Sequence, residues 1–261
     1  TGVQTCALPI LDEKLRHAIT KAATLHFATT NIYKKRIIQM GEKPSTVFNV
    51  GALGVERVKK IKSIKMNEIK KILNIELAKP FFLVTLHSST AGPHSPYLLA
   101  SETIKALKVF DKTPVIMSYS NVDAGGYIIN KMKEIYCKES PNIRVIKKTL
   151  GHELYINCMR YASVVIGNSS SAVIEAPVVG IPTVNIGNRQ EGRIMGASIF
   201  NSSVKKENIV MSINKALKFK KSKNYDHGFG KGETSKKILE YLKLFLKKRN
   251  KPSKEFYDIN F

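Results

Sequence analysis

A run of small hydroxyl side chains follows an apolar segment in the second half of the chain, and it is the strongest candidate for chemistry. Residues 164–175 read VVIGNSSSAVIE, which is typical of a strand, a tight turn and the start of a helix. The serines at 169–171 would then meet main-chain N–H groups at the helix N-terminus, where the helix dipole favours an anion such as a diphosphate. Glu175 on the same helix could accept hydrogen bonds from sugar hydroxyls. The structural alternative is that Asn168 or Ser169 only caps the helix.

A second candidate is the loop GNRQEGR at residues 187–193, which follows an apolar run at 183–186. Its two arginines, Arg189 and Arg193, lie between glycines, and guanidinium groups bind phosphate oxygens through paired hydrogen bonds. The alternative is an ordinary solvated surface loop. Because ligands of open parallel sheets bind beyond the carboxyl ends of the strands, this loop and the serine turn together predict an anion site.

Strand-length apolar runs alternate with helix-length amphipathic segments along most of the chain. The run FFLVTL at 81–86 is apolar almost throughout, which suits a strand buried on both faces. This alternation predicts the α/β class with a doubly wound, Rossmann-like parallel sheet covered by helices on both faces. The expected strands are 26–28, 47–50, 81–86, 114–118, 143–146, 163–166 and 183–186. The expected helices are 11–25, 31–40 (capped by Asn31), 59–73, 97–110, 125–137, 152–161, 171–179, 205–219 and 234–248.

The chain divides into four expected parts. Residues 1–10 carry no charge and no initiator methionine, and we interpret them as a scar or sequence artefact. Residues 11–40 are expected to be the remnant of an N-terminal domain, because a helix pair cannot bury its apolar stripe without partners. A complete doubly wound domain is expected over 41–233, and a C-terminal helix and tail over 234–261.

The composition shows an excess of positive charge. The 261 residues include 43 Lys and Arg against 20 Asp and Glu, a net charge of +23, which attracts phosphates. Most of these residues are lysines scattered over expected polar faces, with no basic motif interleaved with aromatic residues, so we expect no nucleic-acid partner. No apolar window of membrane-spanning length occurs, so we expect no membrane partner either.

The cysteines and glycines give no sign of a disulfide framework, a metal site or a dinucleotide cofactor. Its three cysteines are odd in number and far apart, which argues against a disulfide framework or a zinc site and favours a reducing cytoplasm. No cluster with metal-ligand spacing and no glycine-rich dinucleotide fingerprint occurs. The sequence therefore predicts no metal and no cofactor.

One long segment resembles a known family. The 27-residue run GNSSSAVIEAPVVGIPTVNIGNRQEGR at 167–193 resembles the C-terminal signature of the hydrolysing UDP-N-acetylglucosamine 2-epimerases of sialic- and legionaminic-acid-type biosynthesis. The resemblance extends through LDEKLRHAITKAATLHF at 11–27, residues 48–51, LVTLH at 83–87 and NVDAG at 121–125. It implies a glycosyltransferase-B-like fold of two domains, of which this chain holds the C-terminal Rossmann-like domain.

The resemblance also implies roles in binding UDP. Ser169 and Ser170 match serines that hold the diphosphate, and Glu175 matches the carboxylate on the uridine ribose. Arg189 matches an arginine near the nucleotide. Tyr155 stands where the family carries an aromatic side chain beside the uracil, although by itself it could be a plain core residue.

Further positions match the sugar side of the family's cleft. His87 matches a histidine that contacts phosphate and assists catalysis, whereas a lone histidine at a strand end is more often structural. Asn121 and Asp123 match a substrate-side turn and otherwise would form an ordinary Asx turn. Arg193 matches a position near the nucleotide.

Two residues near the start of the chain, Asp12 and Arg16, match an acid and an arginine that face the sugar. Asp12 would be one of the carboxylates that transfer protons. Their i, i+4 spacing is equally that of a surface ion pair on a helix.

The implied reaction converts UDP-N-acetylglucosamine, or a modified UDP- or GDP-N-acetylhexosamine, to N-acetylmannosamine and UDP through a glycal. Relatives carry a further first domain with essential acids, so we expect this chain to be a fragment with little or no turnover, and the full-length protein to be a homo-oligomer. The alternatives are a nucleotide-sugar-binding half-domain without catalysis and a non-hydrolysing 2-epimerase. A retaining glycosyltransferase would need an acceptor site, which we cannot identify.

Overall fold

The structure is a computed structural model that describes residues 11–89, 93–220, 226–247 and 254–259, with side chains from residue 15 onward. The chain forms two compact units, one within residues 61–227 and the other from residues up to 60 together with those from 228 onward. Each unit is built around its own parallel sheet. No helix of the described residues has the length and apolar composition that crossing a bilayer requires.

The larger unit contains a six-stranded sheet in which every neighbouring pair is parallel. Counted in chain order, its strands lie in the order 3-2-1-4-5-6, which is that of a Rossmann-like sheet. The order reverses between the first and fourth of these strands, so the loops after them diverge and leave a crevice. In space the strands are β5 (Arg144–Lys147), β4 (Val115–Ser118), β3 (Phe82–Thr85), β6 (Val164–Gly167), β7 (Thr183–Ile186) and β8 (Ile199–Ser202).

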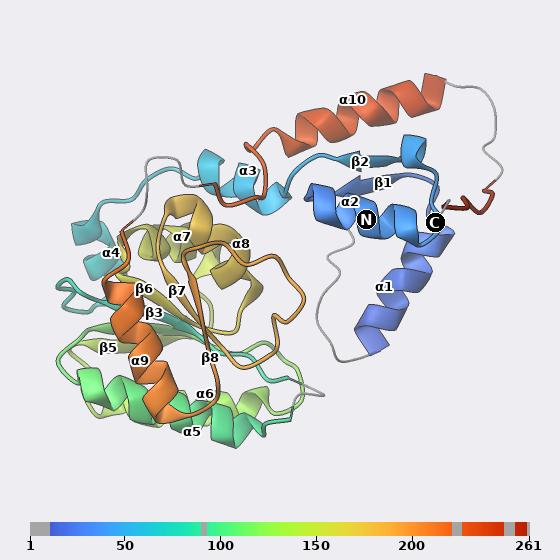
Figure 1. Cartoon of the computed structure of the whole chain (residues 1–261). Helices are drawn as coiled ribbons and strands as arrows, with labels where there is room; N and C mark the ends of the chain where they lie inside the picture. Colours follow the sequence, from blue (N-terminus) through green and yellow to red (C-terminus); the bar gives the residue numbers. More distant parts are fainter. Residues whose placement is uncertain (1–10, 90–92, 221–225, 248–253, 260–261) are drawn as a thin grey trace. The chain divides into compact units, whose positions relative to one another are not determined.

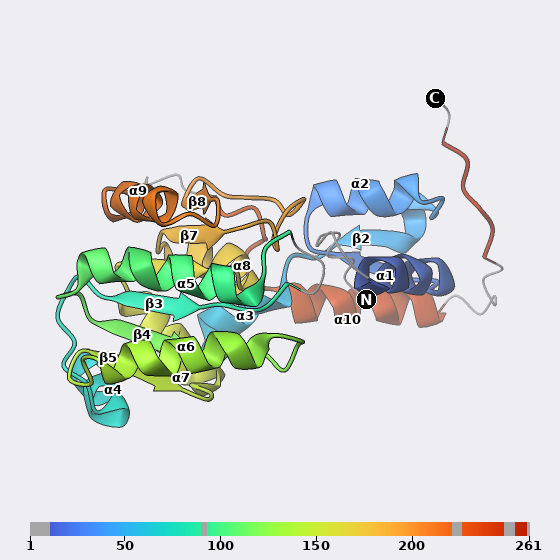
Figure 2. The same cartoon turned by 90° about the horizontal axis from the view of Figure 1, so that it is seen from below.

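Helices cover both faces of this sheet. Figure 1 shows α5 and α6 on one face and α7 and α8 on the other, and Figure 2 shows α5 and α6 side by side. Alternate strand residues such as Phe82 and Val84 pack with α5, α6 and α9 in one core, while their neighbour Leu83 is buried outside that cluster. Burial on both faces explains the continuous apolar runs. The helices are α4 (Met66–Leu73), α5 (Pro96–Leu107), α6 (Gly126–Lys138), α7 (Gly151–Tyr161), α8 (Ser170–Val179) and α9 (Lys206–Leu217).

A glycine is required where β6 ends beside β3. Gly167 has a φ of +143°, and a Cβ atom placed on it would lie 1.9 Å from the main-chain oxygen of Thr85. The same oxygen accepts a hydrogen bond from the N–H of Asn168 at 3.2 Å. The two strand ends therefore approach more closely than any side chain at position 167 would permit.

The smaller unit holds a two-stranded parallel sheet of β1 (His26–Ala28) and β2 (Val47–Asn49). The ring of Phe48 on β2 stacks on Tyr241 of α10 with a centroid separation of 3.9 Å. Leu15 and Ile19 on α1 are about half exposed, at 55% and 49%, so the apolar stripe of this helix is not covered within the described residues. The helices of this unit are α1 (Leu11–Ala22), α2 (Asn31–Gln39), α3 (Leu53–Lys60) and α10 (Thr234–Lys247).

The α/β class with a doubly wound parallel sheet is confirmed, and all seven expected strands are present. The sequence did not predict β8. The domain boundaries expected from the sequence differ from the units of the structure, because β2 pairs with β1 and residues 41–60 belong to the smaller unit. These compact units do not by themselves define domains, so the four-part division of the chain expected from the sequence stays a prediction.

Two local expectations are wrong. Residues 59–73 do not form one helix, because α3 ends at Lys60 and α4 begins at Met66. Side chains of α7 hold the intervening backbone, with Arg160 donating to the oxygen of Ile61 at 3.0 Å and Asn157 to that of Lys62 at 3.0 Å. The cap of α2 is Thr30, not Asn31, since the Thr30 side chain accepts a hydrogen bond from the N–H of Tyr33 at 3.2 Å.

Candidate functional site

Asn168 joins the ends of β3 and β6 at the point where the sheet reverses its order. Its side-chain oxygen accepts the main-chain N–H of His87 at 2.8 Å, and its side-chain nitrogen donates to the main-chain oxygen of His87 at 2.8 Å. Only 2% of Asn168 is exposed. Because the amide satisfies both main-chain groups of His87, it sets the position of that residue relative to the start of α8.

The loop after β7 closes on the same turn. The main-chain oxygen of Asn168 accepts hydrogen bonds from the guanidinium of Arg189 at 3.2 Å and from the side-chain amide of Gln190 at 2.7 Å. Burial lowers the pKa of Arg189, against the opposing charge of Asp123. An arginine stays charged in proteins, so a half-buried cation lies beside the turn that leads into α8.

The first residues of α8 present hydroxyls and main-chain amides together. Ser169 is the cap, with a φ of −76° and a ψ of 149°, and its oxygen accepts the N–H of Ser171 at 3.4 Å. Ser169 is 8% exposed, whereas Ser170 and Ser171 are half-buried. The capping role and the anion-binding role considered from the sequence are therefore compatible in one turn, since the first N–H groups of a helix have no intrahelical acceptors.

Tyr155 on α7 contacts this turn through its hydroxyl. The Tyr155 oxygen lies 2.8 Å from that of Ser171 and 3.3 Å from Oγ1 of Thr85. Burial raises the pKa of Tyr155, although these two hydrogen bonds oppose the shift. The side chain is thus a protonated phenol that joins α7, α8 and the end of β3.

His87 is held as a neutral imidazole. Its Nδ1 accepts the main-chain N–H of Asn121 at 3.1 Å, so the proton of the neutral ring is on Nε2. Burial, together with the positive charges of Arg189 and Lys133, lowers the pKa of His87 to about 4. Near neutral pH, His87 can therefore donate a hydrogen bond through Nε2 but does not carry a positive charge.

Asn121 and Asp123 lie in the loop between β4 and α6. The side-chain nitrogen of Asn121 donates to a carboxylate oxygen of Asp123, and Asn121 itself is exposed. The charge of Asp123 acts on both His87 and Arg189. The two side chains are therefore joined to each other, and Asp123 adds a negative charge at the edge of the site, while the Asx turn considered from the sequence stays a prediction.

Lys133 on α6 is a buried cation that the sequence analysis did not identify. It has no exposed surface, and its Nζ donates to the main-chain oxygen of Ser118 at 2.6 Å. Burial lowers the pKa of Lys133 from 10.5 to about 7. The group therefore titrates near neutral pH at the end of β4.

The other expected residues have less defined places. Glu175 lies half-buried on α8. Arg193 lies in the loop after β7, where its main-chain N–H donates to the main-chain oxygen of Gln190 at 3.2 Å. Arg16 lies on α1 in the smaller unit, so its position relative to these residues is not defined. The side chain of Asp12 lies outside the described residues.

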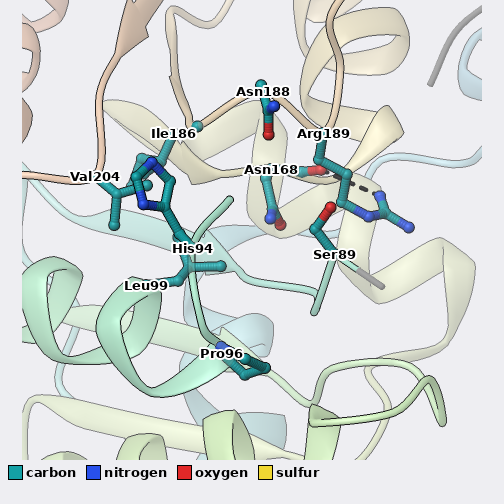
Figure 3. A pocket seen from close by; sticks show the side chains of 10 residues that line it. Ser89, His94, Pro96, Leu99, Asn168, Ile186, Asn188, Arg189 and Val204 are labelled. Atoms are coloured by element: carbon teal, nitrogen blue, oxygen red, sulfur yellow. Dashed lines mark hydrogen bonds between the residues drawn. The ribbon is translucent and has the colours of Figure 1, made fainter. Parts of the chain in front are cut away.

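A pocket opens beside the turn, between the loops after β3 and β7 and the start of α5. Figure 3 shows Asn168, Asn188, Arg189 and Ser89 on one side of it. The other side is mainly apolar and is made by Ile186, Leu99 and Val204, with the ring of His94 among them. The lining of this pocket thus combines a guanidinium and amides on one side with an apolar wall on the other.

The arrangement can bind a negatively charged group and stabilise charge on it. A helix N-terminus, three serines, one guanidinium and a neutral imidazole donor meet at the edge of the sheet where its order reverses. Among the residues with described side chains, no three histidine, cysteine, aspartate or glutamate residues gather in a way that could hold a metal ion.

Several residues at this edge were not predicted, although the sequence carries a signal for some of them. Gln190 lies inside the loop that was singled out for its arginines. Lys133 interrupts an apolar helical stripe that includes Ile129 and Tyr136, which is an unusual place for a lysine. Thr85 and Ser118 end buried strands, and only the strand order brings their hydroxyls together.

The fold and the site features define a Rossmann-like α/β unit with donors for an anion at its switch point. The family profile described as UDP-N-acetylglucosamine 2-epimerase matches residues 5–243, which is most of the chain. The chain therefore belongs to the UDP-N-acetylglucosamine 2-epimerase family.

Individual relatives agree with this assignment. The chain is 36% identical to the polysialic acid biosynthesis protein P7 of Escherichia coli over 95% of its own length and 64% of the relative. It is 32% identical to the hydrolysing GDP/UDP-N,N'-diacetylbacillosamine 2-epimerase of Campylobacter jejuni over 76% of its length and 51% of the relative. The chain thus spans less than two thirds of the length of these relatives.

Solved structures confirm the expected glycosyltransferase-B-like fold. The UDP-GlcNAc 2-epimerase of Neisseria meningitidis bound to UDP-GlcNAc superposes with a TM-score of 0.77 at 15% identity, covering 93% of this chain and 67% of that one. The enzyme of Methanocaldococcus jannaschii superposes with a TM-score of 0.71 at 18% identity, covering 90% and 64%.

The exchange Asn168→Asp tests the connection between β3 and β6. The carboxylate has the same shape but cannot donate to the oxygen of His87, and it places a charge in a buried position. We expect a loss of about 2–4 kcal/mol in the free energy of unfolding, measured in urea. The half-buried neighbour Asn188→Asp serves as the control, with an expected loss below about 1 kcal/mol. Equal losses of unfolding free energy in Asn168→Asp and Asn188→Asp would show that the hydrogen bonds from Asn168 to His87 contribute nothing specific to stability.

Lys133→Met tests the buried cation through pH. Since the pKa of Lys133 is about 7 in the folded chain and 10.5 ordinarily, the unfolded chain binds the extra proton between these values. Stability therefore rises with pH in this window, and the wild type should gain about 2 kcal/mol relative to Lys133→Met between pH 7 and 9. Urea unfolding at both pH values measures it. The exchange Lys138→Met, at an exposed position on the same helix, should leave the pH dependence of the wild type unchanged. A difference in stability between the wild type and Lys133→Met that does not change between pH 7 and 9 would contradict the prediction.

Proposed function

We propose that this chain binds the UDP part of a UDP-N-acetylhexosamine at the crevice between β3 and β6, as part of a hydrolysing UDP-N-acetylglucosamine 2-epimerase. The observation that carries the proposal is the guanidinium of Arg189, hydrogen-bonded to the oxygen of Asn168 immediately before the serines that begin α8. A diphosphate beside this turn would meet a positive charge, hydroxyls and the amide end of a helix together.

The hydrolysing type and the sugar are supported by the relatives. Two of the curated relatives are named hydrolysing 2-epimerases of N,N'-diacetylbacillosamine nucleotides, and another is named for polysialic acid biosynthesis. We propose UDP-N-acetylglucosamine or a modified UDP- or GDP-N-acetylhexosamine as the substrate. Location in the cytoplasm, a homo-oligomeric full-length protein and the lack of a cofactor or nucleic-acid partner stay predictions.

The proposed reaction has two stages. A base removes the proton from C2 of the sugar while the bond from C1 to the UDP oxygen breaks, which leaves a C1–C2 double bond and free UDP. Water then adds, with its hydroxyl on C1 and a proton on C2 from the opposite face, and releases N-acetylmannosamine. Negative charge develops on the departing diphosphate, so donors placed there lower the barrier.

In this reaction, His87 acts as a donor and not as the base. Its Nδ1 is occupied by the N–H of Asn121, and its neutral state places a proton on Nε2. That proton can stabilise a phosphate oxygen of the departing UDP, alongside Arg189, Ser169 and Ser170. The proton on C2 must then be removed by another group, and we propose Asp12 for that step and Arg16 for contact with the sugar.

The remaining assignments follow from the resemblance. Glu175 would accept hydrogen bonds from the uridine ribose, and Tyr155 would lie near the uracil. Asn121 and Asp123 would form the substrate-side turn, and Arg193 would lie near the nucleotide.

Calorimetry with UDP tests the binding site. We expect the wild-type chain to bind UDP and Arg189→Ala to bind it roughly 10–100-fold more weakly, because a charge-assisted hydrogen bond contributes about 1.5–3 kcal/mol. Lys138→Ala, which removes an exposed charge at the far end of α6, should bind UDP like the wild type. A wild-type chain without affinity for UDP, or equal affinities in all three proteins, would overturn the proposal.

Turnover is tested separately by incubating the 261-residue chain with UDP-N-acetylglucosamine and with UDP-N,N'-diacetylbacillosamine and following the products by NMR. Free UDP with an N-acetylmannosamine-type sugar would identify the hydrolysing reaction, whereas an epimerised UDP-sugar would identify the non-hydrolysing one. The sequence predicts little or no turnover by this chain, and a rate above about 1 per second, common for enzymes, would contradict that prediction.

A further inference from the structure

Five hydroxyl groups form a continuous row across the site edge of the sheet. Ser118 Oγ lies 3.0 Å from Thr85 Oγ1, which lies 3.3 Å from the oxygen of Tyr155. The Tyr155 oxygen lies 2.8 Å from Ser171 Oγ, and Ser171 donates to Ser169 Oγ at 3.0 Å. The row thus runs from the end of β4 past β3 and α7 to the cap of α8.

Counting protons gives the row a single direction. Each hydroxyl has one proton to donate. Since Ser171 uses its proton on Ser169, it must accept from Tyr155. Tyr155 must then accept from Thr85, and Thr85 from Ser118. Every proton of the row therefore points toward α8.

The two ends of the row differ in their charged neighbours and in whether the last hydroxyl proton has an acceptor. At the first end, the buried Lys133 donates to the main-chain oxygen of Ser118 at 2.6 Å. At the last end, Ser169 accepts from both the N–H and the hydroxyl of Ser171, and its own proton has no acceptor among the described residues. That proton lies at the start of α8, directly after the residue whose oxygen binds Arg189.

We propose that Tyr155 is a positioning residue that acts through its hydroxyl: it orients Ser171 and thereby directs the proton of Ser169 toward an oxygen of the bound diphosphate. The proposal rests on the proposed function and assigns to Tyr155 a role separate from contact with the base. Hydrogen bonds in a row polarise one another, so a donor at the middle strengthens the donor at the end.

Without the Tyr155 hydroxyl, Ser171 loses its donor and can rotate to use its proton elsewhere. The hydroxyl proton of Ser169 is then no longer directed toward the diphosphate, and the hydroxyl of Thr85 has lost the acceptor for its own proton. The ring of the side chain is unaffected by removal of the hydroxyl alone. A role in the row and a role in stacking on uracil therefore predict different outcomes for a phenylalanine at this position.

The test compares Tyr155→Phe with the wild type for two ligands, UDP by calorimetry and uridine by NMR titration. We expect UDP to bind roughly tenfold more weakly and uridine to bind unchanged, because only the diphosphate meets Ser169. Tyr161→Phe, on the same helix, is the matched control and should change neither affinity. Thermal unfolding of each variant shows that the fold is retained.

A second pair of variants tests the row upstream of Tyr155. Thr85→Val removes the hydroxyl with little change in shape and should weaken UDP binding in the same direction, whereas Thr85→Ser keeps the hydroxyl and should restore it. Adding Thr85→Val to Tyr155→Phe should not weaken UDP binding any further, since the row of hydroxyls is already interrupted.

The outcomes separate the two proposals. A wild-type chain that does not bind UDP overturns the proposed function. A wild-type chain that binds UDP, with Tyr155→Phe unchanged or weakened equally for UDP and uridine, overturns the role of the hydroxyl. Additive losses in the double variant also overturn it, because independent contacts and not a row would then explain the effects.

Discussion

The side-chain amide of Asn168 is the contact on which the rest of the site depends. It bonds to both main-chain groups of His87, while its own main-chain oxygen receives Arg189 and Gln190. One buried residue thus joins the loops after β3, β6 and β7. Without it, the imidazole, the guanidinium and the start of α8 would each depend on a separate loop, and loops are more mobile than the elements they connect.

The electrostatics of the site follow from burial as much as from charge. The same burial that keeps the imidazole of His87 neutral places the guanidinium of Arg189 and the ammonium of Lys133 close enough to act on it. The carboxylate of Asp123 acts in the opposite sense on both His87 and Arg189. An anion that enters replaces solvent around groups that are already oriented, so little reorganisation is needed when charge develops on it.

The sequence predicted most of the helices and strands and pointed to the serine turn and the arginine loop, but it did not predict the contacts that cross between strands. The strands at 81–86 and 163–166 were evident from their apolar runs, and the serine turn and the arginine loop from their composition. The strand β8 was missed because its residues IFNS carry too few apolar side chains to stand out. The row of hydroxyls could not be predicted, since Thr85 and Ser118 come together only through the order of the strands. The break between α3 and α4 was missed for a similar reason, because distant side chains of α7 cause it.

The break between α3 and α4 has a consequence for local unfolding of the larger unit. The oxygens of Ile61 and Lys62 and the N–H of Ile64 are all bonded to side chains of Arg160 and Asn157. The segment 61–65 consequently takes its order from α7 and not from its own turns. We therefore expect the segment to unfold locally together with α7, as one cooperative unit that also carries Tyr155.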